Sequence, residues 1–354
     1  MKITSFYYKK TERGICILRC RSLDTAVVIP EEIEGLPVTE LGDYVCSETC
    51  RTLENGVWDC GKEPEDLPGL WGNRLTELSL PLSVRKIGRY AFYNCEKLEK
   101  LSCSTETLDW GAGAFTGCRG IRQLELWEGT GEKSCFQEII SELPQTLWVH
   151  YHGKQEARLL FPEFFEESVE NMPARILETH IHGCGHQYRY CFKESEFQYR
   201  DYDSLFPHVK VQETEETVLE LAEARLLWPG GLTEENRRMY LEYLTEHKVM
   251  AAVCAIRKKD MERLRWLTGQ CSYHVQDFRK LLEEAAGDPA VVSYLMNLQH
   301  QQLMGACGMK ETDAGASGEN AEVLGIPVGA PAGASKETAG ASGVRKSGRR
   351  KFEL

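Results

Sequence analysis

The stretch LTELSLPLSVRKIGRYAFYNC, residues 75–95, decides the fold because the chain repeats it immediately downstream. Residues 98–118, LEKLSCSTETLDWGAGAFTGC, align with it without gaps at a period of 23 residues. A third copy starts at Ile121 with IRQLEL, and a looser copy, VVIPEEIEGLPVTELGDYVC, lies upstream at residues 27–46. A fixed period of this length is the signature of a solenoid, in which each repeat forms one coil that stacks on the next.

Within each copy, apolar and polar residues alternate before a second apolar group follows. Leu78 and Leu80 are separated by a polar residue, as are Leu101 and Cys103. This period of two predicts a short strand with one face in the core. Because one coil cannot bury the repeated apolar positions alone, they should stack in one continuous core. The residues predicted to be buried together are Leu78, Leu80, Ile87, Ala91, Phe92, Leu101, Trp110, Ala114, Phe115 and Leu124.

The pattern LPxSVxxIGxxAFxNC of residues 80–95 resembles the BspA-type leucine-rich repeat of bacterial proteins. The resemblance covers roughly residues 27–126 and implies a leucine-rich solenoid. It also implies that Cys95 and Cys118 are small, buried apolar groups of the core. Many members of that family are secreted or surface-anchored adhesins.

The composition is that of a soluble protein that repels polyanions. Of the 354 residues, 42% are hydrophobic and 27% are charged, and the formal net charge is −12. This charge disfavours nucleic acid and anionic membranes as partners. The amino-terminal residues contain no apolar run typical of a signal peptide, and no stretch of about 18 apolar residues follows. We therefore expect a cytoplasmic protein whose 14 cysteines are mostly reduced.

The expected fold class is α+β, with a short leucine-rich solenoid of 23-residue coils, a helical hairpin-repeat region and a disordered tail. We assign residues 1–145 to the solenoid, with an inserted loop rich in glycine and proline at residues 51–73. Residues 146–210 contain short aromatic segments and should continue or cap the solenoid. Residues 211–304 show helical periodicity, and residues 305–354 lack large apolar side chains and should be disordered. Helix starts are expected at Thr233, Asp260, Ser272 and Asp288.

The helical region contains a weaker repeat with a spacing of 28 residues. Asp260, Leu264, Trp266 and Leu267 recur as Asp288, Val292, Tyr294 and Leu295. Paired helices in this rhythm are similar to degenerate ankyrin repeats, although the TPLH signature is absent. The resemblance implies helix hairpins stacked side by side, which either bind a partner or only cap the solenoid.

One segment contains the residue types that bind metal ions. HIHGCGHQYRYC, residues 180–191, includes His180, His182, Cys184, His186 and Cys191. In a strand the first two histidines would share one face, and the glycines at 183 and 185 would allow a turn that brings Cys184 or His186 towards them. The spacing matches no standard zinc module, and exposed histidines with inward thiols are the commoner arrangement. We therefore expect neither a metal nor a cofactor, and a metal-binding or thiol-dependent enzyme that uses this cluster is the alternative.

The sequence contains no GxSxG, GxxxxGK[ST] or HExxH motif, and we expect no catalytic residues. The function that follows is a non-enzymatic scaffold for protein–protein interaction. Because inward positions belong to the core, a partner should contact the outward strand positions. These are Glu77, Ser79, Lys100, Ser102, Arg122 and Glu125. An open strip favours a protein or peptide over a small molecule, and the identity of the partner stays open.

Overall fold

The computed structural model describes residues 3–50, 54–171 and 176–308. The tail expected at residues 305–354 lies outside the described residues from residue 309 onward. Its first residues, up to 308, belong to helix α10 (Pro289–Gly308).

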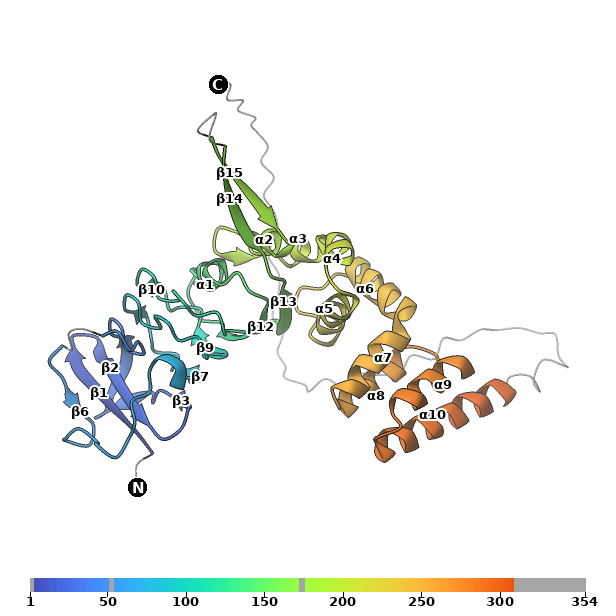
Figure 1. Cartoon of the computed structure of the whole chain (residues 1–354), viewed down its shortest axis with the longest axis horizontal. Helices are drawn as coiled ribbons and strands as arrows, with labels where there is room; N and C mark the ends of the chain where they lie inside the picture. Colours follow the sequence, from blue (N-terminus) through green and yellow to red (C-terminus); the bar gives the residue numbers. More distant parts are fainter. Residues whose placement is uncertain (1–2, 51–53, 172–175, 309–354) are drawn as a thin grey trace, which may run out of the picture. The chain divides into compact units, whose positions relative to one another are not determined.

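The stacked coils form a parallel sheet, as the repeat predicts (Figure 1). Five strands run parallel in chain order, and a sixth returns antiparallel at the edge. They are β3 (Ala26–Val28), β7 (Glu77–Ser79), β9 (Lys100–Ser104), β11 (Gln123–Trp127), β12 (Leu147–His152) and β13 (Ala157–Phe161). The register places Leu78 beside Leu101, Leu101 beside Leu124, and Leu124 beside Val149. One column of inward aliphatic side chains therefore crosses the sheet.

A second sheet is formed by the returning arm of each coil. Its parallel strands β5 (Leu36–Leu41), β8 (Lys86–Ile87) and β10 (Asp109–Trp110) continue onto an amino-terminal hairpin of β1 (Thr4–Thr11) and β2 (Gly14–Ser22). The hairpin shows no repeat and was not expected from the sequence. Two short strands, β4 (Glu32–Ile33) and β6 (Val57–Trp58), pair with β5 and β1, and the 3-10 helix η1 (Gly72–Arg74) precedes β7. Part of the segment expected to be a loop, residues 51–73, is thus a strand of this sheet.

The core between the two sheets contains the predicted residues. Nine of the ten are buried, and Trp110 alone is half-buried. Phe92 and Phe115 stack from neighbouring coils with ring centroids 5.8 Å apart. The coils approach closely at the repeated glycines, since a Cβ on Gly88 or Gly111 would lie within 2.4 Å of the backbone of the preceding coil. Glycine is therefore required at the IG position of the repeat.

The repeated cysteines are core groups. Cys95 donates its thiol hydrogen to the carbonyl oxygen of Cys46 at 3.2 Å, and Cys118 donates to that of Phe92 at 3.0 Å. Burial raises the pKa of both thiols to about 12. They are therefore protonated and unreactive at neutral pH.

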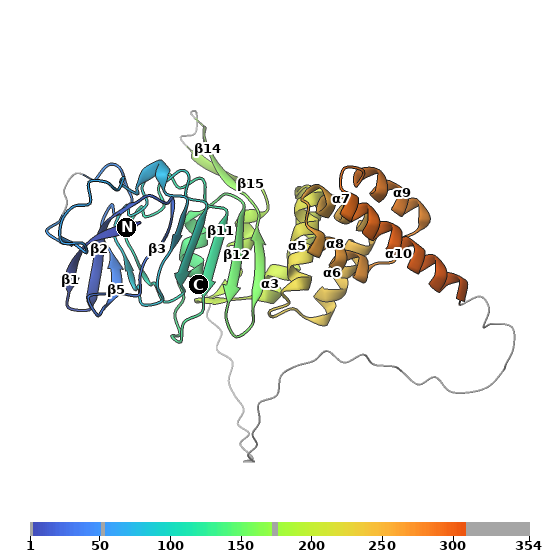
Figure 2. The same ribbon diagram turned by 90° about the horizontal axis from the view of Figure 1, so that it is seen from below.

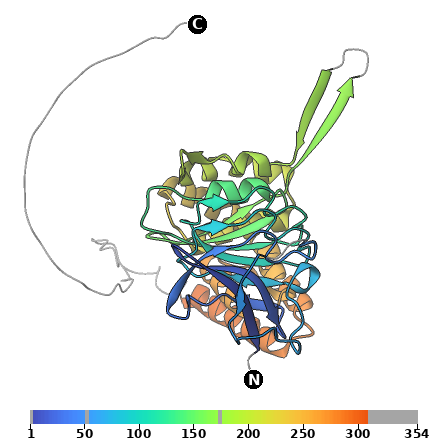
Figure 3. The ribbon, with the colours of Figure 1, turned by 90° about the vertical axis from the view of Figure 1, so that its left-hand side faces the viewer.

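The carboxyl end of the solenoid is closed by α1 (Phe136–Glu142) and by the residues after β13. These form a hairpin of β14 (Phe165–Asn171) and β15 (Ile176–His182), which pairs with neither solenoid sheet (Figure 3). Short elements follow: α2 (Gly185–Tyr188), β16 (Phe192–Lys193), β17 (Glu196–Phe197), α3 (Tyr199–Ser204) and α4 (Phe206–Gln212). The buried guanidinium of Arg189 donates to five backbone carbonyl oxygens around this end. It thereby satisfies carbonyl groups that burial would otherwise leave without donors.

The remaining described chain is helical (Figure 2). The helices are α5 (Glu215–Leu227), α6 (Glu234–Glu246), α7 (Lys248–Arg257), α8 (Met261–Gln270), α9 (Val275–Glu284) and α10. The expected caps at Thr233, Asp260 and Asp288 are present, because each side chain accepts from a backbone N–H of the first turn. The start expected at Ser272 is wrong. Helix α9 begins after His274, whose backbone N–H donates to Asp277.

Candidate binding surface on the solenoid sheet

The outward side chains of the main sheet form two rows across the coils. One row contains Glu77, Lys100 and Gln123, and the other contains Ser79, Ser102 and Glu125. Arg122, expected in the first row, lies before β11 and donates to the carbonyl oxygens of Arg119 and Ile121. The alignment explains this correction: Ile121 corresponds to Leu98, so Gln123 and not Arg122 corresponds to Lys100.

A second correction concerns Ser102, which is only 6% exposed. The indole N–H of Trp127 donates to its hydroxyl at 3.2 Å, so the tryptophan lies over it. Lys100 and Glu125 remain accessible in part and form an ion pair of 2.8 Å across β9 and β11. The outward rows of the main sheet, here called the strip, are thus more apolar than the sequence suggested. Two of their charged side chains also pair with each other.

At its β12 end the strip continues into aromatic and histidine side chains that sequence reasoning missed. Trp148, His150 and His152 alternate along β12 and share its outward face. Trp127 is 41% exposed and stacks on His152, with ring centroids 4.0 Å apart and planes 11° apart. The alternation in LWVHYH indicates this face, but the segment lacks the repeat pattern, so the sequence predicts only a continuation or cap there.

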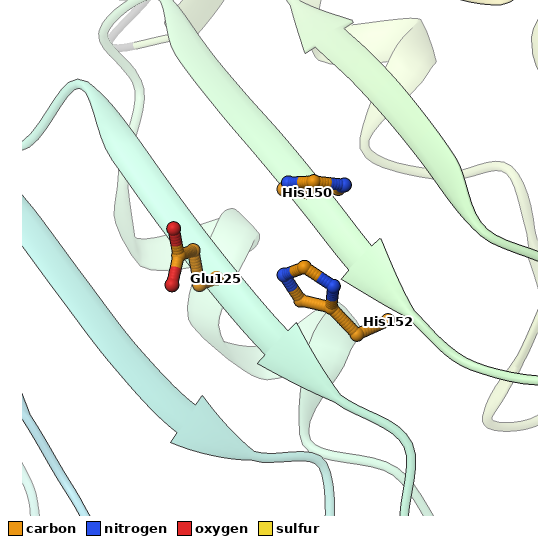
Figure 4. A group of neighbouring side chains, drawn as sticks. All are labelled: Glu125, His150 and His152. Carbon is orange, nitrogen blue, oxygen red and sulfur yellow. The ribbon is translucent and has the colours of Figure 1, made fainter. Parts of the chain in front are cut away.

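Glu125, His150 and His152 meet on this face (Figure 4). Glu125 is the register partner of His150, and one ligand atom from each of the three residues lies within 4.8 Å of the other two. His150 Nε2 lies 2.7 Å from the Glu156 carboxylate, and His152 Nδ1 lies 3.8 Å from it. Burial, and then the neighbouring His150, lower the pKa of His152. The imidazole of His152 is therefore neutral at neutral pH, which leaves one ring nitrogen with a free lone pair.

Arg158 extends this face towards the helices. Its guanidinium lies 4.9 Å from the ring centre of Trp148 and 5.1 Å from that of Trp228, the residue that ends α5. Burial lowers the pKa of Arg158. Cation–π contacts of this kind hold the arginine between the two rings and leave its charge on the surface that joins sheet and helix.

The cluster at residues 180–191, which the sequence offers as an alternative site, is not assembled. His180 and His182 are exposed on β15 beside carboxylates of the hairpin, whereas Cys184 is buried and contacts Glu213. His186 packs against Phe164 and Tyr190. Among the described residues, the group of three metal-ligating side chains with converging ligand atoms is Glu125, His150 and His152.

The thiols of this cluster also lack the character of a nucleophile. Burial raises the pKa of Cys184 and of Cys191 to about 12. A reactive cysteine requires the opposite shift, because the thiolate is the attacking species. The structure therefore gives no support to a thiol-dependent enzyme at these residues.

Comparison with solved structures finds two leucine-rich repeat proteins. The T. pallidum leucine rich repeat protein TpLRR is 25% identical over 37% of this chain and 54% of its own, with a TM-score of 0.22. A leucine rich cell surface protein from Faecalibacterium prausnitzii A2-165 is 18% identical over 41% of this chain and 30% of its own, with a TM-score of 0.23. The chain thus spans about half of the first protein and less than a third of the second. No curated protein matches it.

The family comparison confirms the repeat and corrects the expected location. Residues 71–143 match the BspA type leucine rich repeat region in six copies. The expectation of a cytoplasmic protein is contradicted, because the match to the BspA type leucine rich repeat region points to a surface or secreted protein instead. None of the described helices is long and apolar enough to cross a bilayer. The match at residues 71–143 includes the pattern at residues 80–95 and confirms the repeat that this pattern predicted.

Proposed function

We propose that this protein is a non-enzymatic scaffold that binds a protein or peptide along the outer face of the main solenoid sheet. The observation that carries the proposal is the exposed aromatic end of that face. Trp127 is 41% exposed at an outward position of a regular strand. Trp148 and Arg158 lie on the next two strands. Tryptophan and arginine are the residue types that contribute most to protein interfaces.

The polar part of the strip would give such a contact its orientation. Glu77 and Gln123 are exposed on β7 and β11. Lys100 lies between them on β9 and pairs with Glu125 of β11. Neighbouring strands place these side chains about 4.8 Å apart on a rigid platform. A partner would therefore bury the aromatic end and meet alternating polar groups along the rest of the strip, in the usual arrangement of an apolar interface centre with a polar rim.

We further propose that helices α7 to α10 form a short repeat array of the degenerate ankyrin kind. The support is the 28-residue spacing, which relates Asp260 at the start of α8 to Asp288 at the start of α10. The preceding helices α7 and α9 begin at residues 248 and 275, a similar spacing. The array would extend the scaffold beyond the solenoid. The alternative is that these helices only cap the protein.

The experiment that tests the binding face compares two exposed apolar residues. A partner is first captured from the native surroundings of the protein, identified and purified, and its affinity for the full chain is measured. Trp127→Ser should weaken binding at least tenfold, which corresponds to the loss of one major contact of about 1.4 kcal/mol or more. Leu82→Ser is the matched control, because Leu82 is also exposed, at 55%, but lies in a turn outside the main sheet.

Circular dichroism should show that both variants keep the wild-type fold. Equal affinity of the Trp127 variant and the wild type would place the contact elsewhere. In that case Val249→Ser and Met250→Ser on α7 test the helical region next.

A further inference from the structure

The histidine and carboxylate groups at the β12 end of the strip converge in a way that interaction with a protein does not require. His150 and His152 share one face of β12 because they are two residues apart, and Glu125 lies directly across from His150 on β11. All three come from regular strands of the solenoid. The backbone therefore sets the positions of three potential ligands before any ion arrives.

We propose that Glu125, His150 and His152 bind one divalent transition-metal ion, and that zinc is the ion the ligand set fits best. Two imidazoles and one carboxylate are a common zinc set that leaves a fourth position open. Imidazole nitrogen favours zinc and its neighbours in the transition series over magnesium and calcium, which prefer oxygen ligands alone. The proposal concerns a new site and does not depend on the scaffold function.

The distances fit this assignment after small side-chain rotations. The three ligand atoms lie within 4.8 Å of one another. Ligands held at about 2.0–2.2 Å from a tetrahedral zinc ion lie roughly 3.4 Å apart. Each side chain must therefore move its ligand atom by about an ångström or less, and all three side chains are half-buried.

The state of His152 supports the site independently of these distances. Its Nε2 atom is enclosed by protein and has no hydrogen-bond partner among the described residues. A ring nitrogen of His152 faces Glu125 in Figure 4. Buried polar atoms without a partner are uncommon and require an explanation. An ion bound at this nitrogen would satisfy it.

The surroundings hold the histidine rings in place. Glu156 contacts one nitrogen of His150 and approaches one nitrogen of His152, so the second nitrogen of each ring remains for an ion. Carboxylates that hold one side of a metal-binding imidazole are typical of zinc sites, since they orient the ring and raise its basicity. Trp127 stacks on His152 and limits rotation of its ring. An open hollow lined in part by Trp127, His152 and Glu156 lies beside the proposed site.

Substitutions of Lys100 and of Glu125 should change the metal affinity in opposite directions. Its ammonium group pairs with Glu125 at 2.8 Å and so competes with a cation for the same carboxylate. Lys100→Gln removes this competitor and a positive charge beside the site, so it should increase metal affinity. Glu125→Gln removes a ligand but keeps the shape of the side chain, so it should decrease the affinity. General electrostatics alone would shift cation binding in the same two directions, so His152→Gln, which removes a ligand without removing a charge, separates coordination from this effect.

The experiment titrates Zn²⁺ into metal-stripped full-length protein by calorimetry and follows Co²⁺ binding by visible absorption. Wild type should bind one ion, and Glu125→Gln and His152→Gln should each lose at least about tenfold in affinity, the lower range seen for outer-shell changes. Lys100→Gln should bind more tightly than wild type. His182→Gln, an exposed histidine that also pairs with a glutamate, should bind as wild type does. Mg²⁺ should give no signal.

Three results would overturn the proposal. They are the absence of stoichiometric Zn²⁺ binding, unchanged affinity in Glu125→Gln, and a thiolate-to-cobalt charge-transfer band that disappears in Cys184→Ser. The last result would place the ion at residues 180–191. Circular dichroism checks that each variant is folded. If His152→Gln does not fold, His150→Gln decides the question, because it removes the other imidazole ligand from a partly exposed side chain.

Discussion

Phe92→Ala tests the continuous core that the repeat predicts. Phe92 is fully buried and contacts Phe115 of the next coil with ring centroids 5.8 Å apart. A buried phenylalanine removes roughly 150–200 Å² from water, which at about 25 cal/mol per Å² contributes about 4–5 kcal/mol. Alanine retains part of this burial, while the cavity adds a cost, so we expect a loss of about 3–5 kcal/mol in the free energy of unfolding. This is a large fraction of the roughly 5–15 kcal/mol that stabilises a typical domain.

The assay is denaturant unfolding of the full chain, followed by circular dichroism and tryptophan fluorescence. Phe165→Ala is the matched control, because it removes the same atoms from a side chain that is 57% exposed on β14. It should change the free energy of unfolding by no more than about 0.5 kcal/mol. Phe92→Leu keeps most of the volume and should cost less than Phe92→Ala. If Phe92→Ala costs no more than Phe165→Ala, the coils do not share one core and the reasoning fails.

Three further predictions concern the cap, the helix starts and the thiols. Arg189→Met should lower the thermal midpoint strongly and cost at least about 3 kcal/mol, because it leaves several buried carbonyl groups without donors. Asp288→Ala should cost about 1 kcal/mol by loss of its cap, while Ser272→Ala should cost less than about 0.5 kcal/mol because α9 begins after His274. The free energy of unfolding should fall as the pH rises from about 9 towards about 12, since the Cys95 and Cys118 thiols stay protonated only in the folded state. Equilibrium unfolding at several pH values checks this sign. Replacing both residues with alanine should make the slope less steep, because other buried thiols such as Cys16 and Cys20 contribute the rest.

The core could be predicted from the sequence because a solenoid repeats its geometry. Leu78, Leu101 and Leu124 occupy equal positions in three copies, and equal positions in a parallel stack become neighbours. The amino-terminal hairpin could not be predicted in the same way, because β1 and β2 belong to no copy. Their place in the sheet depends on the pairing of β2 with β5, which the chain sets only in three dimensions.

The binding face was harder to predict than the core because an outward position depends on more than its own strand. Ser102 alternates correctly with Leu101, yet Trp127 from the neighbouring coil lies over it and removes it from the surface. Arg122 was misplaced by one residue, and a shift of one residue in a strand exchanges the two faces. Both errors concern long-range contacts or register, which the alternation of side chains in one segment does not define.

Comparison of two histidine pairs in this chain shows which surroundings bring metal-binding side chains together. His150 with His152 and His180 with His182 have the same spacing, and both pairs lie on strands. The second pair has the more suggestive sequence, because Cys184 and His186 follow within a few residues. Yet Cys184 turns into the core, and the strand opposite His180 and His182 is one arm of an exposed hairpin.

The first pair has no cysteine nearby in the sequence, but the solenoid supplies its partner from the preceding coil. Glu125 precedes His150 by 25 residues, close to the period of 23 that defines the coils. Ser79, Ser102, Glu125 and His150 therefore form one row across the sheet. The period of 23 alone would place Trp148 in this row, and the two extra residues before β12 place His150 there instead. Residues that are adjacent in a strand point to opposite faces, whereas residues on neighbouring coils of a solenoid lie side by side in one row. Ligands for one ion in a solenoid are therefore best sought on neighbouring coils.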